Sequence, residues 1–451
     1  MQNGKLVVGY VGLSKASWKT PKIEKISKQA IESLSRLDIE VVPLKELATS
    51  EDEAIKAASE FRRKGVDTVV MHFTTFPAGA MIPALIGRVE VPVILFANPE
   101  EPTEDGMWEQ NSFCGANLGA FVMRKLGKPT RFAWGRAEEA DKALASTLSV
   151  VRAEKQLRDA RIGIIGGRVP GFYTSNMDEM KLRKHFGATV ETIDVVEIIE
   201  LARTIGGEEA KKGLQIVHES AKTTCGVSSE ELRLGGNLIA AIQKTVEKYK
   251  LTALGIRCWP EFSDIYGIAP CSTIGMLNSL GMPTSCEGDL PGVVTMLIQK
   301  GLLENSSPFF MDFISFDEKD NTGVVWHCGA TSSKLCGNFE ETKLCKHFRV
   351  DGGNKKGLTN EFSLKPGRIT VTKLDETENG YRMLIFTGTG VEMNKFMRGN
   401  PLRIKFDTPV RGIVDTIMKK GFEHHYAVVY GDIKDKLISF CETNGIEPVV
   451  C

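Results

Sequence analysis

The sequence has no excess of charge of either sign, since Lys plus Arg and Asp plus Glu both number 57 among its 451 residues. A neutral chain is a poor partner for nucleic acid or for an anionic membrane surface, because both attract bulk positive charge. It also lacks an apolar run of about 18 residues, the length of a membrane-spanning helix. The opening stretch, MQNGKLVVGYVGLS, has no cleavage signature and predicts a first strand, not a signal peptide. No nucleic-acid or membrane partner is therefore expected.

Paired cysteines are also absent. The ten cysteines are scattered along the chain, and none forms a CxxC pair. Scattered cysteines in a long chain without a signal peptide are typical of reduced thiols, so we expect a cytoplasmic protein. A structural zinc held by cysteines is not expected, because the ligand spacing of such sites is missing.

Three common catalytic fingerprints are missing as well. The segment IGIIGGRVPG, residues 162–171, follows a predicted strand, but its glycines do not match GxGxxG and Pro170 would disturb a helix start. We interpret this segment as a tight strand-to-loop turn. The chain has neither a GxxxxGK(S/T) loop nor a GxSxG elbow, so phosphate-loop chemistry and serine hydrolysis have no anchor. A dehydrogenase is the weakest hypothesis.

Short apolar strands alternate with amphipathic helices through the first two thirds of the chain. This alternation predicts parallel sheets covered by helices on both faces, with ligands at the carboxyl ends of the strands. After Gly301 the pattern changes to strands joined by turns. We expect two Rossmann-like parallel-sheet α/β domains, at residues 1–157 and 158–305, followed by a β-rich C-terminal domain at residues 306–451.

Two carboxylates are notable for their positions. Glu287 follows a short predicted strand and precedes an apolar helix, where α/β enzymes place catalytic groups. Its neighbour Asp289 is explained by helix capping. Asp312 lies in PFFMDFIS, an almost wholly apolar strand, and a buried carboxylate needs a metal, another cation or a hydrogen-bonding partner. The pattern alone favours a metal and an ordinary salt bridge about equally.

Three of the seven histidines occupy informative positions. His327 ends an apolar strand, and His424 and His425 lie between a predicted helix and the strand YAVVYGD. Because adjacent strand residues point to opposite faces, only one of these two neighbours is expected to face a given site. Carboxylates with imidazoles and no cysteine suit Mn²⁺, Mg²⁺, Fe²⁺ or Co²⁺ better than a structural zinc.

Two loops with polar and aromatic residues are candidate sugar-binding segments. Arg257, Trp259 and Glu261 follow a predicted strand end, where they would line a polyol pocket or form an ion pair that stabilises the fold. Trp108 and Gln110 lie in a similar loop of the first domain. We predict that these five residues contact the substrate.

Taken together, these motifs resemble those of the L-fucose isomerase and L-arabinose isomerase superfamily. The resemblance rests on CEGD, on MD in an apolar strand, on HCG after a strand, and on GxxHH near the C-terminus. The order of the three expected domains also agrees over essentially the whole chain. The segments CGANLGAFVMRKLGKP and GFYTSNMDEMKLRKHFG resemble the fucose-isomerase-like branch.

The resemblance implies a divalent metal, expected to be Mn²⁺, held by two acidic residues and histidine. These ligands fall on Glu287, Asp312 and His425, and His327 falls on a further ligand of arabinose-type sites. Aspartate at position 312 agrees with fucose isomerases, because arabinose isomerases carry glutamate there.

The activity implied is aldose–ketose isomerisation of a monosaccharide through an ene-diol, with Glu287 and Asp312 as the acid/base pair. The resemblance further implies a homo-oligomer, a hexamer or trimer, with active sites shared between subunits. Two alternatives remain open. One is an isomerase of an anionic sugar, a sulfosugar or sugar acid, whose charge Arg257 or Arg168 would receive. The other is a non-catalytic sugar-binding protein, which would not need a carboxylate–histidine centre.

Overall fold

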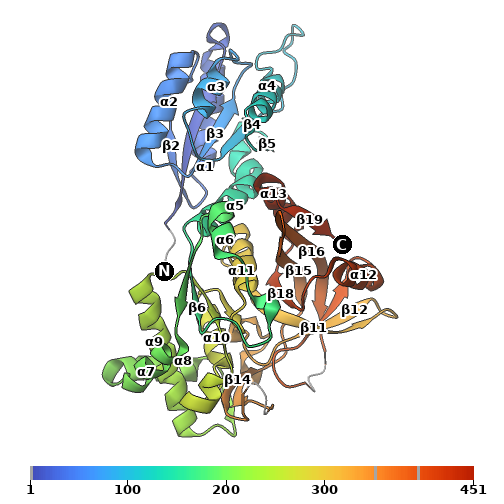
Figure 1. The fold of residues 1–451 in the computed structure, drawn as a ribbon. Helices are drawn as coiled ribbons and strands as arrows, with labels where there is room; N and C mark the ends of the chain where they lie inside the picture. The colour runs from blue at the N-terminus through green and yellow to red at the C-terminus, as the bar shows by residue number, and fades with distance from the viewer. Residues whose placement is uncertain (1–3, 350–352, 394–396) are drawn as a thin grey trace. The chain divides into compact units, whose positions relative to one another are not determined.

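The computed structural model describes residues 4–349, 353–393 and 397–451 (Figure 1). The chain divides into two compact units, residues 1–155 with 442–444 and residues 156–441 with 445–451. The second unit contains both the second α/β region and the β-rich region, and the predicted boundary between those two regions stays a prediction. Among the described helices, none combines the length and the apolar character that crossing a membrane requires.

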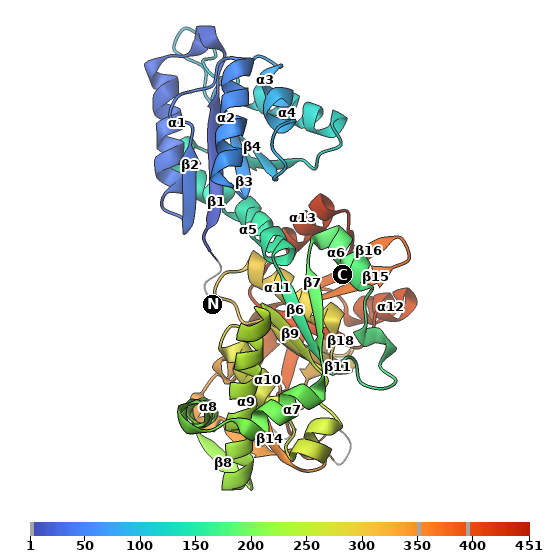
Figure 2. The ribbon, with the colours of Figure 1, turned by 60° about the vertical axis from the view of Figure 1, so that its left-hand side comes forward.

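The first unit is built on a five-stranded parallel sheet with the order β2-β1-β3-β4-β5. Its strands are β1 (Leu6–Leu13), β2 (Ile39–Pro43), β3 (Thr68–Phe73), β4 (Val93–Ala97) and β5 (Arg131–Trp134). Its helices are α1 (Pro21–Leu34), α2 (Glu51–Lys64), α3 (Met81–Ile86), α4 (Ser112–Lys125) and α5 (Ala140–Arg158). Along β1, Val8 and Tyr10 pack with α1 and α5, whereas Val11 and Leu13 pack with α2, α3 and α4. Helices therefore cover both faces of this sheet, as the sequence pattern predicts (Figure 2).

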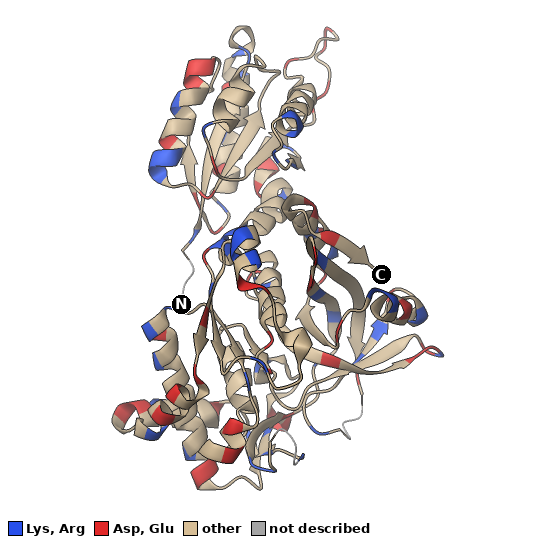
Figure 3. Ribbon diagram, in the orientation of Figure 1, with Lys and Arg blue, Asp and Glu red and all other residues tan. Residues whose placement is uncertain are grey.

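Local signals in the sequence set the ends of α2. Ser50 and Glu53 form a capping box at its start, and Gly65 ends it in a left-handed conformation. Acidic residues occupy the first turn of α2 and basic residues occupy the last, as the red and blue ends of this helix show (Figure 3). This distribution of charge complements the helix dipole.

The second unit begins with a four-stranded parallel sheet of order β10-β9-β6-β7. Its strands are β6 (Arg161–Ile165), β7 (Thr189–Ile193), β9 (Ala253–Ile256) and β10 (Thr284–Cys286). The helices of this region are α6 (Glu179–Phe186), α7 (Val195–Thr204), α8 (Gly207–Glu219), α9 (Ser229–Tyr249), α10 (Cys271–Ser279) and α11 (Leu290–Leu302).

Six strands of the β-rich region close into a small antiparallel barrel. The order is β15-β18-β11-β12-β17-β16, and β16 pairs back with β15 to complete the ring. The strands are β11 (Phe309–Asp317), β12 (Thr322–Trp326), β15 (Gly367–Thr377), β16 (Gly380–Val391), β17 (Leu402–Phe406) and β18 (His425–Tyr430). A further strand, β19 (Glu447–Val450), adds to β16 in parallel. The predicted fold class, two parallel α/β regions followed by a β-rich region, is confirmed.

Helix α11 joins the second parallel sheet to the barrel. All of its residues except Lys300 are buried. Gln299 Nε2 donates to Ala427 O of β18 at 3.0 Å, and Leu374 N of β15 donates to Thr295 Oγ1 at 3.1 Å. These bonds fix α11 against the barrel, so the position of its first turn relative to β11 and β18 is also fixed.

Three short strands and two helices complete the second unit. A small sheet of order β14-β13-β8 is made of β8 (Thr223–Cys225), β13 (Lys343–Lys346) and β14 (Gly357–Glu361). The helices are α12 (Val410–Lys420) and α13 (Lys434–Asn444), whose residues 442–444 are counted with the first unit.

Candidate metal and active site

Glu287 lies in the turn between β10 and α11, where two successive residues adopt the left-handed conformation. The φ angles are +61° at Glu287 and +67° at Gly288. A Cβ at residue 288 would lie 2.0 Å from Gly167 O, so only glycine fits where the loops after β6 and β10 meet. Gly166 and Gly167 are left-handed too, which confirms the strand-to-loop turn expected for IGIIGGRVPG. This packing fixes Glu287 at the carboxyl end of the parallel sheet.

Asp312 and His425 lie opposite each other on the neighbouring strands β11 and β18. Alternation along the two strands decides which way they face. Met311 packs in the barrel core, whereas Phe310 and Ala427 pack with the core of the α/β region. Side chains two residues apart share a face, so Asp312 and His425 point out of the barrel toward the start of α11.

His425 is fully buried, and its ring lies against the carboxylates of Glu287, Asp289, Asp312 and Glu423. Its Nε2 is 2.8 Å from Glu287 Oε2 and 3.6 Å from Asp312 Oδ1. Its Nδ1 is 2.8 Å from Asp289 Oδ2. Nε2 and Asp312 Oδ1 are buried atoms without a well-aligned hydrogen bond among the described residues. Buried polar atoms are rarely left so, and a cation between them would satisfy both.

The spacing of these donor atoms fits a divalent cation. Adjacent ligands about 2.1 Å from an octahedral ion are roughly 3.0 Å apart. The separation of 2.8 Å between His425 Nε2 and Glu287 is close to this value, and the separation of 3.6 Å to Asp312 is longer. Asp312, His327 and His425 each offer a ligand atom within 4.8 Å of the others. A set of carboxylate oxygens and imidazole nitrogens suits Mn²⁺ and similar ions. The residues present therefore fit the metal that the sequence implies.

The expectation that only one of the two adjacent histidines faces the site is wrong. Glu287, His424 and His425 also offer ligand atoms within 4.8 Å of one another. The strand β18 begins at His425, so His424 precedes it and the alternation of a strand does not apply. His424 is exposed, and its Nδ1 lies 3.3 Å from Glu423 Oε2.

A buried network of charged residues contacts His425, and the sequence did not predict it. Asp289 caps α11 by accepting from Gly292 N, and it also accepts from His425 Nδ1. The second bond selects the tautomer that leaves the Nε2 lone pair free for a metal. Lys373 is fully buried, contacts Glu423 and lies 3.9 Å from Asp289. No clear signal for this network stands in the sequence, because β15 also carries Arg368, Asp375 and Glu376, so Lys373 is not unusual there.

The surroundings shift the pKa values of the three central residues in different directions. Burial lowers the pKa of His425, but the adjacent carboxylates of Asp289 and Glu287 outweigh it and raise the pKa to about 9. Burial raises the pKa of Asp312 above its ordinary value despite two nearby imidazoles. Burial opposes ionisation of Glu287 as well, yet His425 outweighs it and the pKa lies below its ordinary value. The space between the side chains of Glu287, Asp312 and His425 therefore favours a bound cation.

Of the three predicted sugar contacts of the second unit, Trp259 lies beside Glu287. Trp259 Nε1 lies 3.5 Å from Glu287 Oε1, and the ring of Phe172 lies 6.0 Å from that of Trp259. Arg257 Nη2 forms an ion pair with Glu261 Oε1, the alternative weighed from the sequence. Arg257 Nε and Glu261 Oε2 are nevertheless buried without hydrogen-bond partners in the described chain. Each of these two atoms can therefore form a hydrogen bond with a ligand.

Arg168 is a second cation near this position. Its backbone is close to Gly288, because a Cβ there would lie 3.1 Å from Arg168 Cα. The guanidinium lies over the ring of Tyr173, 5.0 Å from its centroid. Within the described residues it makes no ion pair.

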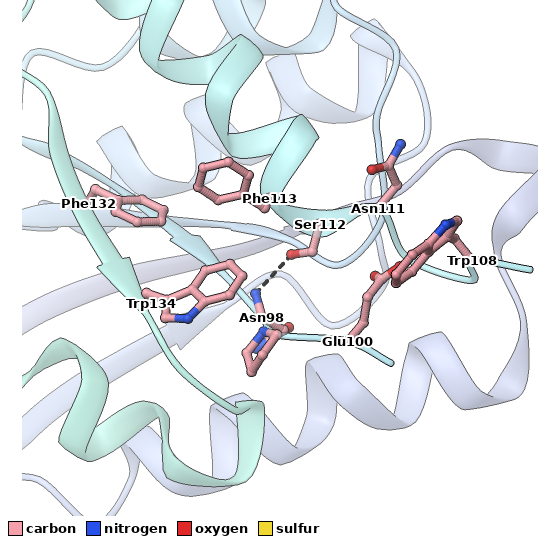
Figure 4. Close-up of a pocket in the computed structure, with 9 residues that line it drawn as sticks. Asn98, Glu100, Trp108, Asn111, Ser112, Phe113, Phe132 and Trp134 are labelled. Carbon is pink, nitrogen blue, oxygen red and sulfur yellow. Dashed lines mark hydrogen bonds between the residues drawn. The ribbon is translucent and has the colours of Figure 1, made fainter. Parts of the chain in front are cut away.

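Trp108 and Gln110 belong to the first unit, and their contact with substrate stays a prediction. Trp108 lines a pocket of about 630 Å³ at the carboxyl edge of the first sheet. Phe113, Phe132 and Trp134 gather across this pocket from it (Figure 4). Gln110 is buried, and its backbone oxygen accepts from Phe76 N at 2.8 Å.

Comparison with known proteins connects this geometry to two family models. Residues 9–158 match the N-terminal domain of fucose/sulfoquinovose isomerases, and residues 325–450 match the C-terminal domain of L-fucose isomerase. A sulfoquinovose isomerase of Alkalicoccus urumqiensis is 30% identical over 436 residues, 96% of each chain. A sulfoquinovose isomerase of Priestia aryabhattai is 28% identical over 454 residues, 100% of both chains.

One solved structure, a periplasmic solute-binding protein from Actinobacillus succinogenes with bound D-allose, covers 66% of this chain and 92% of its own. The sequence identity is 12% and the TM-score is 0.19, a likeness too low to carry an argument.

Proposed function

The chain belongs to the family of fucose and sulfoquinovose isomerases, and we propose that this aldose–ketose isomerase acts on a sulfonated hexose such as sulfoquinovose. Membership of an enzyme family sets aside the non-catalytic sugar-binding alternative. The observation that carries the choice of an anionic substrate is the pair Arg257 and Arg168, whose loops meet the Glu287–Gly288 turn. Gly288 N donates to the oxygen of Ile256, the residue before Arg257, and a Cβ at residue 288 would lie 3.1 Å from Arg168 Cα. The chain's curated relatives are named for sulfoquinovose.

A sulfonate is a permanent anion with three acceptor oxygens, and arginine presents several N–H donors in a planar fork. Arg257 Nε is a buried donor without a partner, so a ligand oxygen there would satisfy it. Arg168 has its guanidinium over an exposed tyrosine ring and is available for a second contact. The two cations support recognition of the charged end of the sugar, while Glu287 and Asp312 act at C1 and C2.

We also propose that the enzyme depends on Mn²⁺ or a related divalent ion. The residues that would hold it are Glu287, Asp312 and His425, with His327 as a fourth ligand. Such an ion, when bound, polarises the oxygens on C1 and C2 of the open-chain sugar and stabilises their developing charge.

The isomerisation itself moves one proton from C2 to C1 and one from O2 to O1. Glu287, whose pKa is lowered, is ionised and suited to take the C2 proton. Asp312, whose pKa is raised, is suited to give a proton to O1 and to take the proton of O2 in return, while Glu287 returns its proton to C1. The rings of Phe172 and Phe310 lie 6.3 and 4.5 Å from that of His425. They limit the access of water to the ene-diol.

The test is ketose formation from sulfoquinovose and from neutral aldoses, with Mn²⁺ present. We expect kcat/KM for sulfoquinovose to exceed that for L-fucose by at least about 100-fold, because two arginine contacts to an anion are at stake. Arg257→Gln should remove most of this preference by raising KM. Arg161→Gln is the matched control, because Arg161 pairs with Glu191 at the amino end of β6. A faster reaction with neutral aldoses would refute the anionic substrate.

We also propose that the enzyme is a trimer or hexamer with active sites shared between subunits, as the family resemblance implies. Phe113, Phe132 and Trp134 expose 52%, 43% and 47% of their surface, and an exposed apolar patch of this kind marks an interaction surface. Light scattering on the active enzyme tests this proposal, and a fully active monomer would contradict it.

A further inference from the structure

Three ligands that favour soft metals converge at a second place in the second unit. Cys271, Cys328 and His347 each offer a ligand atom within 4.8 Å of the others. They come from three separate segments, the start of α10, the loop after β12 and the loop after β13. Cys271 and His347 are buried, and Cys328 is half-buried. We propose that these residues form a site for a thiophilic divalent cation of the Zn²⁺ type.

The distance between the two sulfurs agrees with this assignment. Cys271 Sγ and Cys328 Sγ are 3.7 Å apart. Two thiolates bound about 2.3 Å from a tetrahedral zinc are separated by roughly 3.8 Å. A disulfide would need about 2.05 Å. The pair is therefore spaced for a shared cation without movement of the backbone.

Each ligand is held in place by its surroundings. Cys271 is the first residue of α10 and is buried. Close packing fixes the imidazole of His347, because a Cβ at Gly353 would lie 2.1 Å from its Cγ. Nδ1 of that ring lies 3.4 Å from Arg349 O and 3.2 Å from Arg349 N. The tautomer in which Nδ1 donates to Arg349 O leaves the Nε2 lone pair for a metal, whereas the one in which Nδ1 accepts from Arg349 N does not, so metal binding would select the first.

The chemistry of this site differs from that of the carboxylate centre. Thiolates select soft cations, whereas the set of Glu287, Asp312 and His425 selects harder ones. Both thiols release their protons when the cation binds. Three protein ligands leave one tetrahedral position open, as in sites that bind water or a small ligand. Cys328 Sγ also lies 3.5 Å from His327 Nδ1, so the two sites are neighbours.

The missing CxxC spacing excludes only a zinc site whose ligands lie close together in the chain. Here the fold assembles ligands at positions 271, 328 and 347. The spacing of cysteines along the chain carries no information about such a site. The absence of a CxxC pair therefore does not contradict the proposal.

Titration with Co²⁺ tests the proposal, because thiolate ligation produces a charge-transfer band in the near ultraviolet that carboxylate ligation does not. We expect a band that saturates at one equivalent in protein already loaded with Mn²⁺. Cys271→Ser and Cys328→Ser should each halve the band. His347→Gln should keep the band and weaken Co²⁺ affinity at least about 10-fold.

Cys441→Ser is the matched control, a buried thiol that contacts Met383 Sδ in another part of the unit, and it should leave the band unchanged. Mn²⁺ binding measured by electron paramagnetic resonance should persist in Cys271→Ser, which separates this site from the carboxylate centre. No band in the wild type, or a band that survives both Cys271→Ser and Cys328→Ser, would overturn the proposal.

If a variant does not fold, the wild type alone can test the site. The rate at which each cysteine is alkylated is measured by mass spectrometry, with and without Zn²⁺. Zn²⁺ should slow modification of Cys271 and Cys328 at least about 10-fold and leave the exposed Cys114 unaffected. Equal rates with and without Zn²⁺ would reject the site.

Discussion

His72 in the first unit and His425 in the second are both fully buried strand residues, yet their surroundings give them different chemistry. His72 lies between two neutral groups, with Nδ1 2.5 Å from Tyr10 Oη and Nε2 2.5 Å from Asn98 Oδ1. Burial lowers the pKa of His72 to about 4, whereas the pKa of His425 is raised to about 9. Both nitrogens of His72 are occupied, so it has no lone pair to offer a metal.

In His425 one nitrogen is bound by Asp289 and the other lies unmatched beside Glu287 and Asp312. Burial alone therefore does not separate a structural histidine from a metal ligand. The separation comes from the charge of the partners and from the state of the second nitrogen. Four predictions, three from substitutions and one from pH, would sharpen or break this comparison.

The largest effect is expected where the carboxylates of the second unit lose their charge. Glu287→Gln and Asp312→Asn should each lower kcat/KM about 10²–10⁴-fold, because each removes an acid/base group and a metal ligand. Steady-state kinetics on sulfoquinovose measures this loss. Asp317→Asn is the control, because Asp317 is exposed at the end of the same strand β11. Full activity in both site variants would remove the proposed mechanism.

The two histidines should respond differently to the same substitution. His425→Gln should weaken Mn²⁺ binding at least about 100-fold, because it removes a metal ligand. His72→Gln should leave Mn²⁺ affinity unchanged and lower the free energy of unfolding by about 1–3 kcal/mol, because it disturbs a buried hydrogen-bonded group. Calorimetric titration and urea unfolding of both variants check the contrast. Equal Mn²⁺ affinities would mean that the environment of His425 has been misinterpreted.

Asp289→Asn is expected to have an intermediate effect. Asparagine caps a helix about as well as aspartate, so α11 should keep its start. The carboxylate that orients His425 is lost, and Mn²⁺ affinity should fall about 10–100-fold. The matched variant is Asp178→Asn, which alters the cap of α6 away from the site. A fall in thermal stability without a change in Mn²⁺ affinity would show that Asp289 acts only as a cap.

The smallest effect concerns pH and the first unit. The unfolded chain binds a proton at His72 with a pKa of about 6.5, and the folded chain does so only near 4. Stability from this residue is present above pH 6.5 and is lost as the pH falls toward 4. Between pH 7 and pH 5 the loss should be about 2 kcal/mol. Urea unfolding of the wild type and His72→Gln at both values measures it, and an equal pH response in both would contradict the assignment.

The sequence identified Glu287 and Asp312 because a carboxylate after a strand and a carboxylate inside an apolar strand are both unusual. It also predicted the parallel sheets, whose strand and helix periods are local. The closure of the barrel depends on the pairing of β15 with β16 and of β18 with β11, which are set by contacts distant in the chain. For the same reason the ion pair of Lys373 with Glu423 and the second bond of Asp289 were not predicted.

The expected choice between His424 and His425 shows a different limit. The period of a strand applies only inside it, and β18 begins at His425. The sequence predicted a strand there but not its first residue, and one residue decides whether alternation separates the pair.

The most direct test of the metal-dependent isomerase is the rate of sulfoquinovose isomerisation as Mn²⁺ is returned to chelated, metal-free enzyme. The predicted result is negligible activity without metal, full recovery at one Mn²⁺ per carboxylate centre, and no recovery in His425→Gln. Full activity in the metal-free enzyme, or equal recovery in His425→Gln, would contradict the role assigned to Glu287, Asp312 and His425.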